Sequence, residues 1–212
     1  MSDSKLIQRW KNMVQSLPEQ TQLLAVSKYT TDEKVACLIK AGQQDFAEAK
    51  PQSLRDRAQH YPQVRWHMIG PLQKNKAKYV GKFAATWHSL CDVETALAVA
   101  KHVQDRVLPV WIQVNISGES QKQGVSEADL TLFYTQICPI KELHVVGLMG
   151  MAAKDGDKRQ TFAKLRQCRD NLLAQFPESA CQGLSMGMSN DWRIAIEEGA
   201  TMIRLGSNIF ND

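Results

Sequence analysis

No apolar run in this sequence approaches the length of a membrane-spanning helix, and the N-terminus lacks the apolar core of a signal peptide. The five cysteines are scattered, odd in number and free of any Cys-x-x-Cys pair, which favours buried thiols in a reducing compartment. Glycine and proline, at 12 and 7 residues, are too scarce for a fibrous or disordered chain. We therefore expect an ordinary globular protein of the cytoplasm that does not bind a membrane.

No block of charge of one sign is present either. The 26 basic and 22 acidic side chains give a formal net charge of +4 that is spread along the chain. This balance favours small anionic ligands only weakly and gives no indication of nucleic-acid binding. The 212 residues suffice for one substantial core, so we predict a single domain over residues 1–212. No unexplained apolar stripe marks a subunit interface, which favours a monomer.

The sequence does contain short apolar runs that alternate with segments of helical period. An amphipathic helix is predicted over residues 4–17, followed by strands over 22–28, 45–48, 64–70, 85–90, 108–116, 144–151, 182–188 and 201–206. Helices are predicted between them, over 31–42, 53–61, 74–79, 93–104, 127–137, 161–176 and 191–198. About eight strands separated by helices indicate a parallel sheet, which closes most naturally into a (β/α)8 TIM barrel. An open doubly wound sheet is the alternative.

The first of these strands ends on a lysine, Lys28. Buried there, its amine would lose hydration and could attack a carbonyl to form an imine, whereas an ordinary lysine would extend into water. Near the C-terminus, Ser185–Ser189 and Arg204–Ser207 each follow an apolar run and offer backbone N–H groups and hydroxyls suited to a phosphate. An amine and a phosphate site together indicate pyridoxal 5′-phosphate (PLP), which carries an aldehyde and a phosphate on one ring. A closed barrel would make these segments neighbours.

Six blocks of the sequence, in the same order and spread over nearly the whole chain, resemble the pyridoxal phosphate homeostasis proteins, single-domain relatives of the alanine racemase barrel domain. The blocks are Ala25–Lys28, Trp66–Lys76, Gln113–Ser117, Gly147–Met149, Leu184–Asp191 and Ile203–Gly206. Each block alone is weak, but the tryptophan-histidine and serine-methionine-glycine blocks are specific in combination.

The resemblance implies a barrel that holds PLP as an imine on Lys28, with the phosphate bound by Ser189, Gly206 and Ser207. It also implies that Arg204 faces the pyridine nitrogen of the cofactor. A guanidinium group only donates hydrogen bonds, so the ring nitrogen would accept one and stay unprotonated. An unprotonated ring stabilises a substrate carbanion poorly, although it can still form an imine.

The remaining candidate cofactor contacts each have a second interpretation. His67 lies near the cofactor by the family pattern, or is a core histidine with satisfied hydrogen bonds. Asn75 borders the mouth of the site or belongs to a solvated basic face, and Asn115 faces the ring or orients a loop. Met149 and Met188 contact the cofactor or fill the core, and Ser185 belongs to the cradle proposed for the phosphate.

The sequence departs from the family pattern after the second predicted strand. There the family usually has glycine, glutamate and asparagine, and here Ala47, Glu48 and Ala49 stand in their place. Ala49 cannot make the hydrogen bond to the ring that an asparagine would make at this position.

Racemases of this fold class need a general base on the opposite face of the imine, and the resemblance implies that an extra β-domain and a dimer partner supply it. This sequence ends shortly after its last predicted strand. We therefore predict a protein that buffers or delivers PLP in vitamin B6 homeostasis without robust turnover, with PLP-dependent apo-enzymes as candidate recipients. A small racemase or lyase and a phosphate-binding barrel without PLP are the alternatives.

Overall fold

Eight parallel strands close into a barrel in the computed structural model, which describes residues 3–117, 123–153 and 155–211. Each strand pairs with the next along the chain, and β8 returns to pair with β1, so that Leu24 lies opposite Arg204. The strands are β1 (Gln22–Val26), β2 (Asp45–Glu48), β3 (Arg65–Met68), β4 (Thr86–Leu90), β5 (Leu108–Gln113), β6 (Leu143–Met149), β7 (Gly183–Ser185) and β8 (Met202–Leu205). The predicted (β/α)8 barrel is confirmed.

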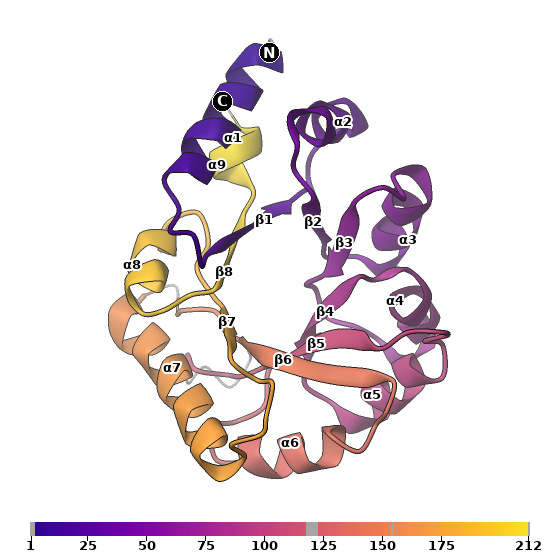
Figure 1. Ribbon diagram of the computed structural model, residues 1–212, viewed down its shortest axis with the longest axis vertical. Coiled ribbons are helices and arrows are strands. Elements are labelled where there is room, and N and C mark those ends of the chain that lie inside the picture. Colours follow the sequence, from indigo (N-terminus) through magenta and orange to yellow (C-terminus); the bar gives the residue numbers. More distant parts are fainter. Residues whose placement is uncertain (1–2, 118–122, 154, 212) are drawn as a thin grey trace.

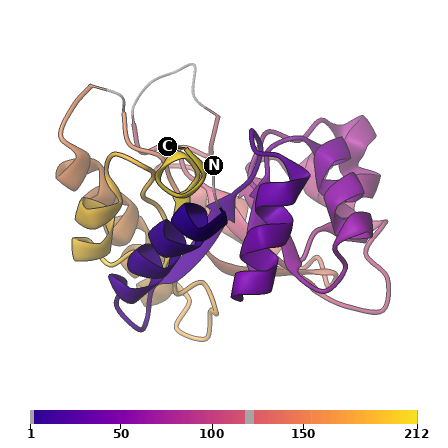
Figure 2. The same ribbon diagram turned by 90° about the horizontal axis from the view of Figure 1, so that it is seen from above.

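Helices surround the ring of strands (Figure 1). They are α1 (Asp3–Gln15), α2 (Asp32–Ala41), α3 (Pro51–His60), η1 (Lys74–Lys76), α4 (Ala77–Phe83), α5 (Val93–Ala100), α6 (Leu130–Ile137), α7 (Lys158–Gln175), α8 (Trp192–Glu197) and α9 (Ser207–Phe210). The leading helix is confirmed as α1, which lies beside α9 in both views (Figures 1 and 2). The side chain of Arg9 donates from Nε to the Ile209 carbonyl at 3.1 Å, which joins the two ends of the chain.

Several elements end a few residues from their predicted bounds, and two of the differences affect the cavity wall described below. Helix α9 was not predicted, because its four residues are too few to show a helical period. Strand β7 ends at Ser185, three residues earlier than predicted. The cause is Gly187, whose φ of +92° is a left-handed conformation that no strand contains.

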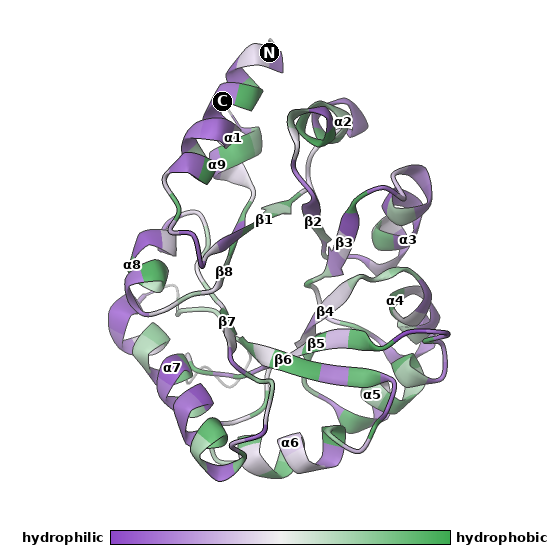
Figure 3. Cartoon of the chain, in the orientation of Figure 1, coloured by the Kyte–Doolittle hydropathy of each residue, from purple (hydrophilic) through white to green (hydrophobic). Residues whose placement is uncertain are grey.

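Alternate side chains of the strands face opposite sides, as the pleat requires. Trp66 and Met68 belong to the large outer core between strands and helices, whereas Leu24, Ala47, Trp111, Met149 and Met202 form a separate apolar cluster. That cluster fills part of the barrel interior. Figure 3 shows both hydrophobic and hydrophilic residues on the surrounding helices, as expected for helices with one buried face.

Trp111 fits across the interior because two facing positions lack side chains. A Cβ atom on Gly147 would lie 2.4 Å from Trp111 Cζ3, and one on Gly183 would lie 2.5 Å from Trp111 Cη2. Both distances are far shorter than van der Waals contact. The glycines of β6 and β7 therefore make room for the indole ring.

The sequence also predicted buried thiols and the lack of a membrane-spanning helix. All five cysteines are free, and Cys37, Cys168 and Cys181 are buried as expected. Cys138 is exposed and Cys91 partly so, which corrects the prediction that every thiol is buried. Within the described residues, no helix is both long enough and apolar enough to cross a membrane.

Candidate functional site

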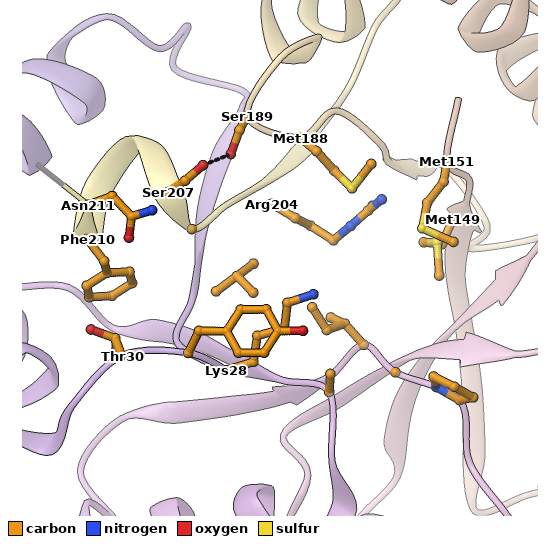
Figure 4. A pocket seen from close by; sticks show the side chains of 17 residues that line it. Lys28, Thr30, Met149, Met151, Met188, Ser189, Arg204, Ser207, Phe210 and Asn211 are labelled. Atoms are coloured by element: carbon orange, nitrogen blue, oxygen red, sulfur yellow. Dashed lines mark hydrogen bonds between the residues drawn. The ribbon is translucent and has the colours of Figure 1, made fainter. Parts of the chain in front are cut away.

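A cavity of about 500 Å³ opens where the strands end at their carboxyl side. Its walls come from the segments that follow β1, β2, β3 and β7, from the end of β6, and from β8 and α9. This is the face on which barrel proteins bind their ligands, and the volume is typical of small-molecule sites. Figure 4 shows Lys28 reaching into the cavity, with Arg204 between the Ser189–Ser207 pair and the side chains of Met149 and Met151.

Lys28 stands in a tight turn immediately after β1. The turn is closed by the Thr30 N–H, which donates to the Ser27 carbonyl at 3.0 Å and leaves Lys28 and Tyr29 at its centre. The Lys28 side chain lines the cavity but is exposed, with Nζ 5.0 Å from the centre of the Tyr29 ring. The sequence-based expectation of a buried lysine is therefore wrong, because the turn carries the residue beyond the end of the strand.

Ser27 fixes the backbone that carries this lysine. Its hydroxyl donates to Glu48 Oε1 at 2.6 Å, and its N–H donates to the Ala47 carbonyl at 3.0 Å. Burial raises the pKa of Glu48, and the hydrogen bond from Ser27 opposes part of that shift. The turn after β1 is thus tied to the end of β2, which limits the positions available to Lys28.

Two serine hydroxyls meet on the opposite wall. Ser207 Oγ donates to Ser189 Oγ at 2.7 Å, and Asn208 Nδ2 donates to the Ser189 carbonyl at 3.3 Å. The backbone bonds of α9 begin at Ile209, whose N–H donates to Gly206, so the N–H groups of Ser207 and Asn208 precede the first helical bond. Hydroxyls and N–H groups of this kind suit a phosphate.

The loop that carries Ser189 depends on Gly187. A Cβ atom there would lie 2.7 Å from the Ala195 Cβ, so a larger residue would push the loop away from α8. Met188, whose side chain lines the cavity, donates its N–H to Asp191 Oδ1 at 2.6 Å. These contacts hold the loop with Ser189 toward the cavity.

Arg204 extends from β8 and is only 5% exposed. Its Nη1 donates to Ser185 Oγ at 2.8 Å and its Nη2 to the Gly150 carbonyl at 3.0 Å. Burial lowers the pKa of Arg204 to about 10, partly offset by Asp191, so the group remains a cation at neutral pH. Among the residues that the structure describes, it forms no ion pair with a carboxylate.

Ser185 and His67 lie deeper in the barrel than the cavity. Ser185 is fully buried and bonds to Arg204 and to His88, whose Nδ1 is 3.1 Å away. His67 is 3% exposed and bonds to Asp45 and His88, each at 3.0 Å. Neither residue lines the cavity, so His67 corresponds to the core histidine of the second interpretation. Sequence reasoning did not single out His88, because β4 also contains a polar threonine and a polar serine, so no pattern in the strand marks the histidine.

The two predicted asparagines also lie outside the cavity lining. Asn75 is exposed on η1. Asn115 donates its N–H to the Val125 carbonyl at 2.9 Å and accepts from Ser117 Oγ at 3.0 Å, so it orients the loop after β5.

The structure brings together the larger part of the predicted set and adds residues that the sequence did not indicate. The predicted residues that line the cavity are Lys28, Met149, Met188, Ser189, Arg204, Gly206 and Ser207. Those added by the structure include Thr30, Met151, Phe210 and Asn211. Phe210 and Asn211 come from the unpredicted turn α9 and its C-cap, so no sequence pattern marked them.

Asp45, which accepts a hydrogen bond from His67, is also held by Arg65. Arg65 donates to both carboxylate oxygens at 2.7 and 2.6 Å. Burial alone would raise the pKa of Asp45, but the hydrogen bonds from His67 and Arg65 outweigh it and lower the pKa to about 2. Folding therefore stabilises the ionised form.

Replacing Asp45 with asparagine is expected to lower the free energy of unfolding at pH 7 by about 2 kcal/mol, because the pKa shift from 3.8 to about 2 is lost. The contribution is complete above the unfolded pKa and disappears as the pH falls through the folded one. Urea unfolding should therefore show a difference between the proteins that is about half as large at pH 3 as at pH 7. Asp56→Asn, which removes an exposed carboxylate beside Arg55, should change little at either pH. An equal difference at both values would contradict this account of Asp45.

The groups that line the cavity fit PLP. The amine in the cavity can react with the aldehyde of PLP, the pair of hydroxyls can bind the phosphate, and the buried cation can donate a hydrogen bond to the ring nitrogen.

Comparison with known proteins identifies the family. The family described as alanine racemase, N-terminal domain, matches residues 2–212. Relatives called pyridoxal phosphate homeostasis protein are 38% identical over 204 residues in Vibrio alginolyticus and 34% identical over 203 residues in Escherichia coli K12. The chain belongs to the pyridoxal phosphate homeostasis protein family.

These family relatives are matched over most of their length. The alignments cover 91% of this chain in both cases and 87% and 86% of the relatives. PipY from Synechococcus elongatus, solved without PLP, superposes with a TM-score of 0.91 at 29% identity and covers 97% of this chain and 100% of its own. The structure of PipY with PLP bound gives 0.89 at 28% identity over the same shares. Alanine racemase from Clostridium difficile, at 12% identity and a TM-score of 0.80, shares the fold over 55% of its own chain.

Proposed function

We propose that this pyridoxal phosphate homeostasis family member binds PLP covalently through Lys28 and buffers or delivers it without robust turnover. The observation that carries the proposal is that Lys28, Arg204 and the Ser189–Ser207 pair all line the same cavity. The PLP-bound structure of PipY, a close match in fold, supports it. We further propose that residues 1–212 act as one PLP-binding domain, as a cytoplasmic monomer, with PLP-dependent apo-enzymes as recipients.

Each wall of the cavity has a role in this proposal. Lys28 would supply the amine to which the aldehyde carbon of PLP can be joined covalently, with the aldehyde oxygen lost as water. Ser189, Ser207 and the N–H groups beside Gly206 would hold the phosphate. Arg204 would donate a hydrogen bond to the ring nitrogen and so disfavour its protonation.

The cavity lining favours binding over turnover. The ionisable side chains among the described lining residues are Lys28, Tyr29 and Arg204. Tyr29 is 91% exposed and shares its turn with Lys28, so it is poorly placed to act as a base across the ring. A racemase or lyase needs such a second group to exchange a proton.

Titration of the purified protein with PLP tests the proposal. We expect an imine absorption band that borohydride abolishes while fixing the cofactor to the chain. The loaded protein should then show no sustained turnover with a panel of amino acids. Steady racemisation or elimination would establish the enzyme instead. A protein that binds inorganic phosphate but develops no band with PLP would support the phosphate-binding alternative and overturn ours.

A further inference from the structure

A continuous chain of hydrogen bonds runs through the barrel interior from the cavity toward the opposite end. Arg204 Nη1 is 2.8 Å from Ser185 Oγ, which is 3.1 Å from His88 Nδ1. His88 Nε2 is 3.0 Å from His67 Nδ1, and His67 Nε2 is 3.0 Å from Asp45 Oδ1. Five side chains from β8, β7, β4, β3 and β2 are therefore joined in sequence.

With one proton on each histidine, the two ends of this series of hydrogen bonds fix the direction of every bond in it. Arg204 can only donate, so the oxygen of Ser185 accepts from it. Asp45, with a pKa of about 2, is ionised and can only accept, so His67 carries its proton on Nε2. A neutral His67 then accepts at Nδ1, which places the proton of His88 on Nε2. The bare Nδ1 of His88 finally accepts the hydroxyl proton of Ser185.

When both histidines are neutral, every donor and acceptor that faces a neighbour in this series has a hydrogen-bond partner. One extra proton on the histidine pair would place an N–H on His88 Nδ1, facing the Ser185 hydroxyl, which would then lose its acceptor. Ser185 and His88 are fully buried, so such a loss is costly. Burial, together with the nearby cation of Arg204, lowers the pKa of His88 well below its usual value.

The surroundings hold the chain in this arrangement. The rings of His88 and Trp111 stack with centres 5.2 Å apart and planes 11° apart, and Arg65 clamps Asp45 at the far end. Groups that link an opposite pair of charges through aligned donors strengthen one another in a low-dielectric interior. The buried cation of Arg204 thus reaches a carboxylate through three intervening side chains.

We propose that Asp45, His67, His88 and Ser185 are positioning residues, which hold the Arg204 guanidinium at the cavity through a one-way hydrogen-bond chain with both histidines in the Nε2–H tautomer. The part of this inference that concerns PLP rests on the function proposed above. The tautomers of the two histidines follow from the hydrogen bonds alone and do not depend on PLP. The competing explanation is a set of core polar groups that satisfy one another without influence on the cavity.

Nitrogen-15 NMR of histidine-labelled protein without PLP tests the chain directly, because the ring nitrogen shifts report which atom carries the proton. At neutral pH we expect His67 and His88 to show a bare Nδ1 and a protonated Nε2. An Nδ1–H tautomer or a doubly protonated ring at either position would overturn the inference. Variants that lack one histidine assign the signals.

A matched pair of variants at His67 distinguishes a directed chain from simple packing. Gln at this position can accept from His88 and donate to Asp45, whereas Leu can do neither. In His67→Gln we expect His88 to keep its Nε2–H tautomer, and in His67→Leu to populate the Nδ1–H form. An unchanged His88 in the Leu variant would overturn the proposal. Should that variant fail to fold, Asp45→Asn provides the same test, since an amide can also donate and no longer fixes the direction.

The effect on the cavity is measured with PLP. We expect the apparent affinity to fall roughly threefold to tenfold in His67→Leu, as for loss of one ordinary hydrogen bond, and to be restored in His67→Gln. Equal affinity in the Leu variant and wild type would refute the positioning role. If wild type itself fails to bind PLP, the proposed function fails while the tautomer result still stands.

Discussion

Replacing Lys28 with alanine is expected to abolish both the imine absorption band and the fixation of PLP by borohydride. Only this side chain supplies a primary amine to the cavity among the described lining residues. Without the amine, no carbon–nitrogen bond can form, and borohydride has nothing to reduce. The variant should retain its fold, because the Lys28 side chain is exposed and its turn is held by Ser27.

Lys50→Ala is the matched control for this experiment. Lys50 is also an exposed lysine close to the site, directly after the lining residue Ala49, but it does not line the cavity. The control should bind and fix PLP as wild type does. Borohydride fixation that persists in Lys28→Ala and disappears in Lys50→Ala would show that the wrong lysine has been assigned. Mass spectrometry of the reduced protein identifies the labelled residue in each case.

Replacing both Ser189 and Ser207 with alanine is expected to weaken PLP binding by at least roughly a hundredfold, because each lost hydrogen bond to a charged group contributes about 1.5–3 kcal/mol. The two hydroxyls lie 2.7 Å apart and face the same cavity, so both can reach one phosphate. The decisive comparison is with pyridoxal, which has the aldehyde but no phosphate. Its affinity should be the same in the variant and in wild type.

Equilibrium titrations with both ligands separate the possible outcomes. Equal losses for PLP and pyridoxal would mean that the substitutions damage the cavity rather than remove a phosphate site. No loss for either ligand would place the phosphate elsewhere. Ser126→Ala, which removes an exposed hydroxyl bonded to Asp129, should leave both affinities unchanged.

The cofactor segments were predictable because their signals are local. An apolar strand that ends on Lys28 and the small polar residues after the last two strands can each be recognised within a few residues. The closure that makes them neighbours follows from counting strands, and the pairing of β1 with β8 confirms it. The exposure of Lys28 was not predictable in this way, because β1 ends at Val26, two residues earlier than predicted, and the turn that follows no longer keeps the side-chain alternation of a strand.

The buried network could not be derived from the sequence. Asp45, His67, His88 and Ser185 come from four strands, and their contacts depend on the register of each strand against the next. The irregular register between β4 and β5 has no mark in the sequence. A shift of one residue in any strand would turn its polar side chain outward and break the chain.

The sequence by itself determined the alternation of helices and strands, the barrel that this alternation favours, and the lysine and serines that follow its strands. Periodicity and loop composition carry this information, and both are short-range properties of the chain. Only the tertiary structure decided that Lys28 is exposed, that His67 lies beneath the cavity rather than in its wall, and that Arg204 is linked to Asp45. The physical reason is that side-chain contacts inside a barrel are set by closure and register, which involve residues far apart in the sequence.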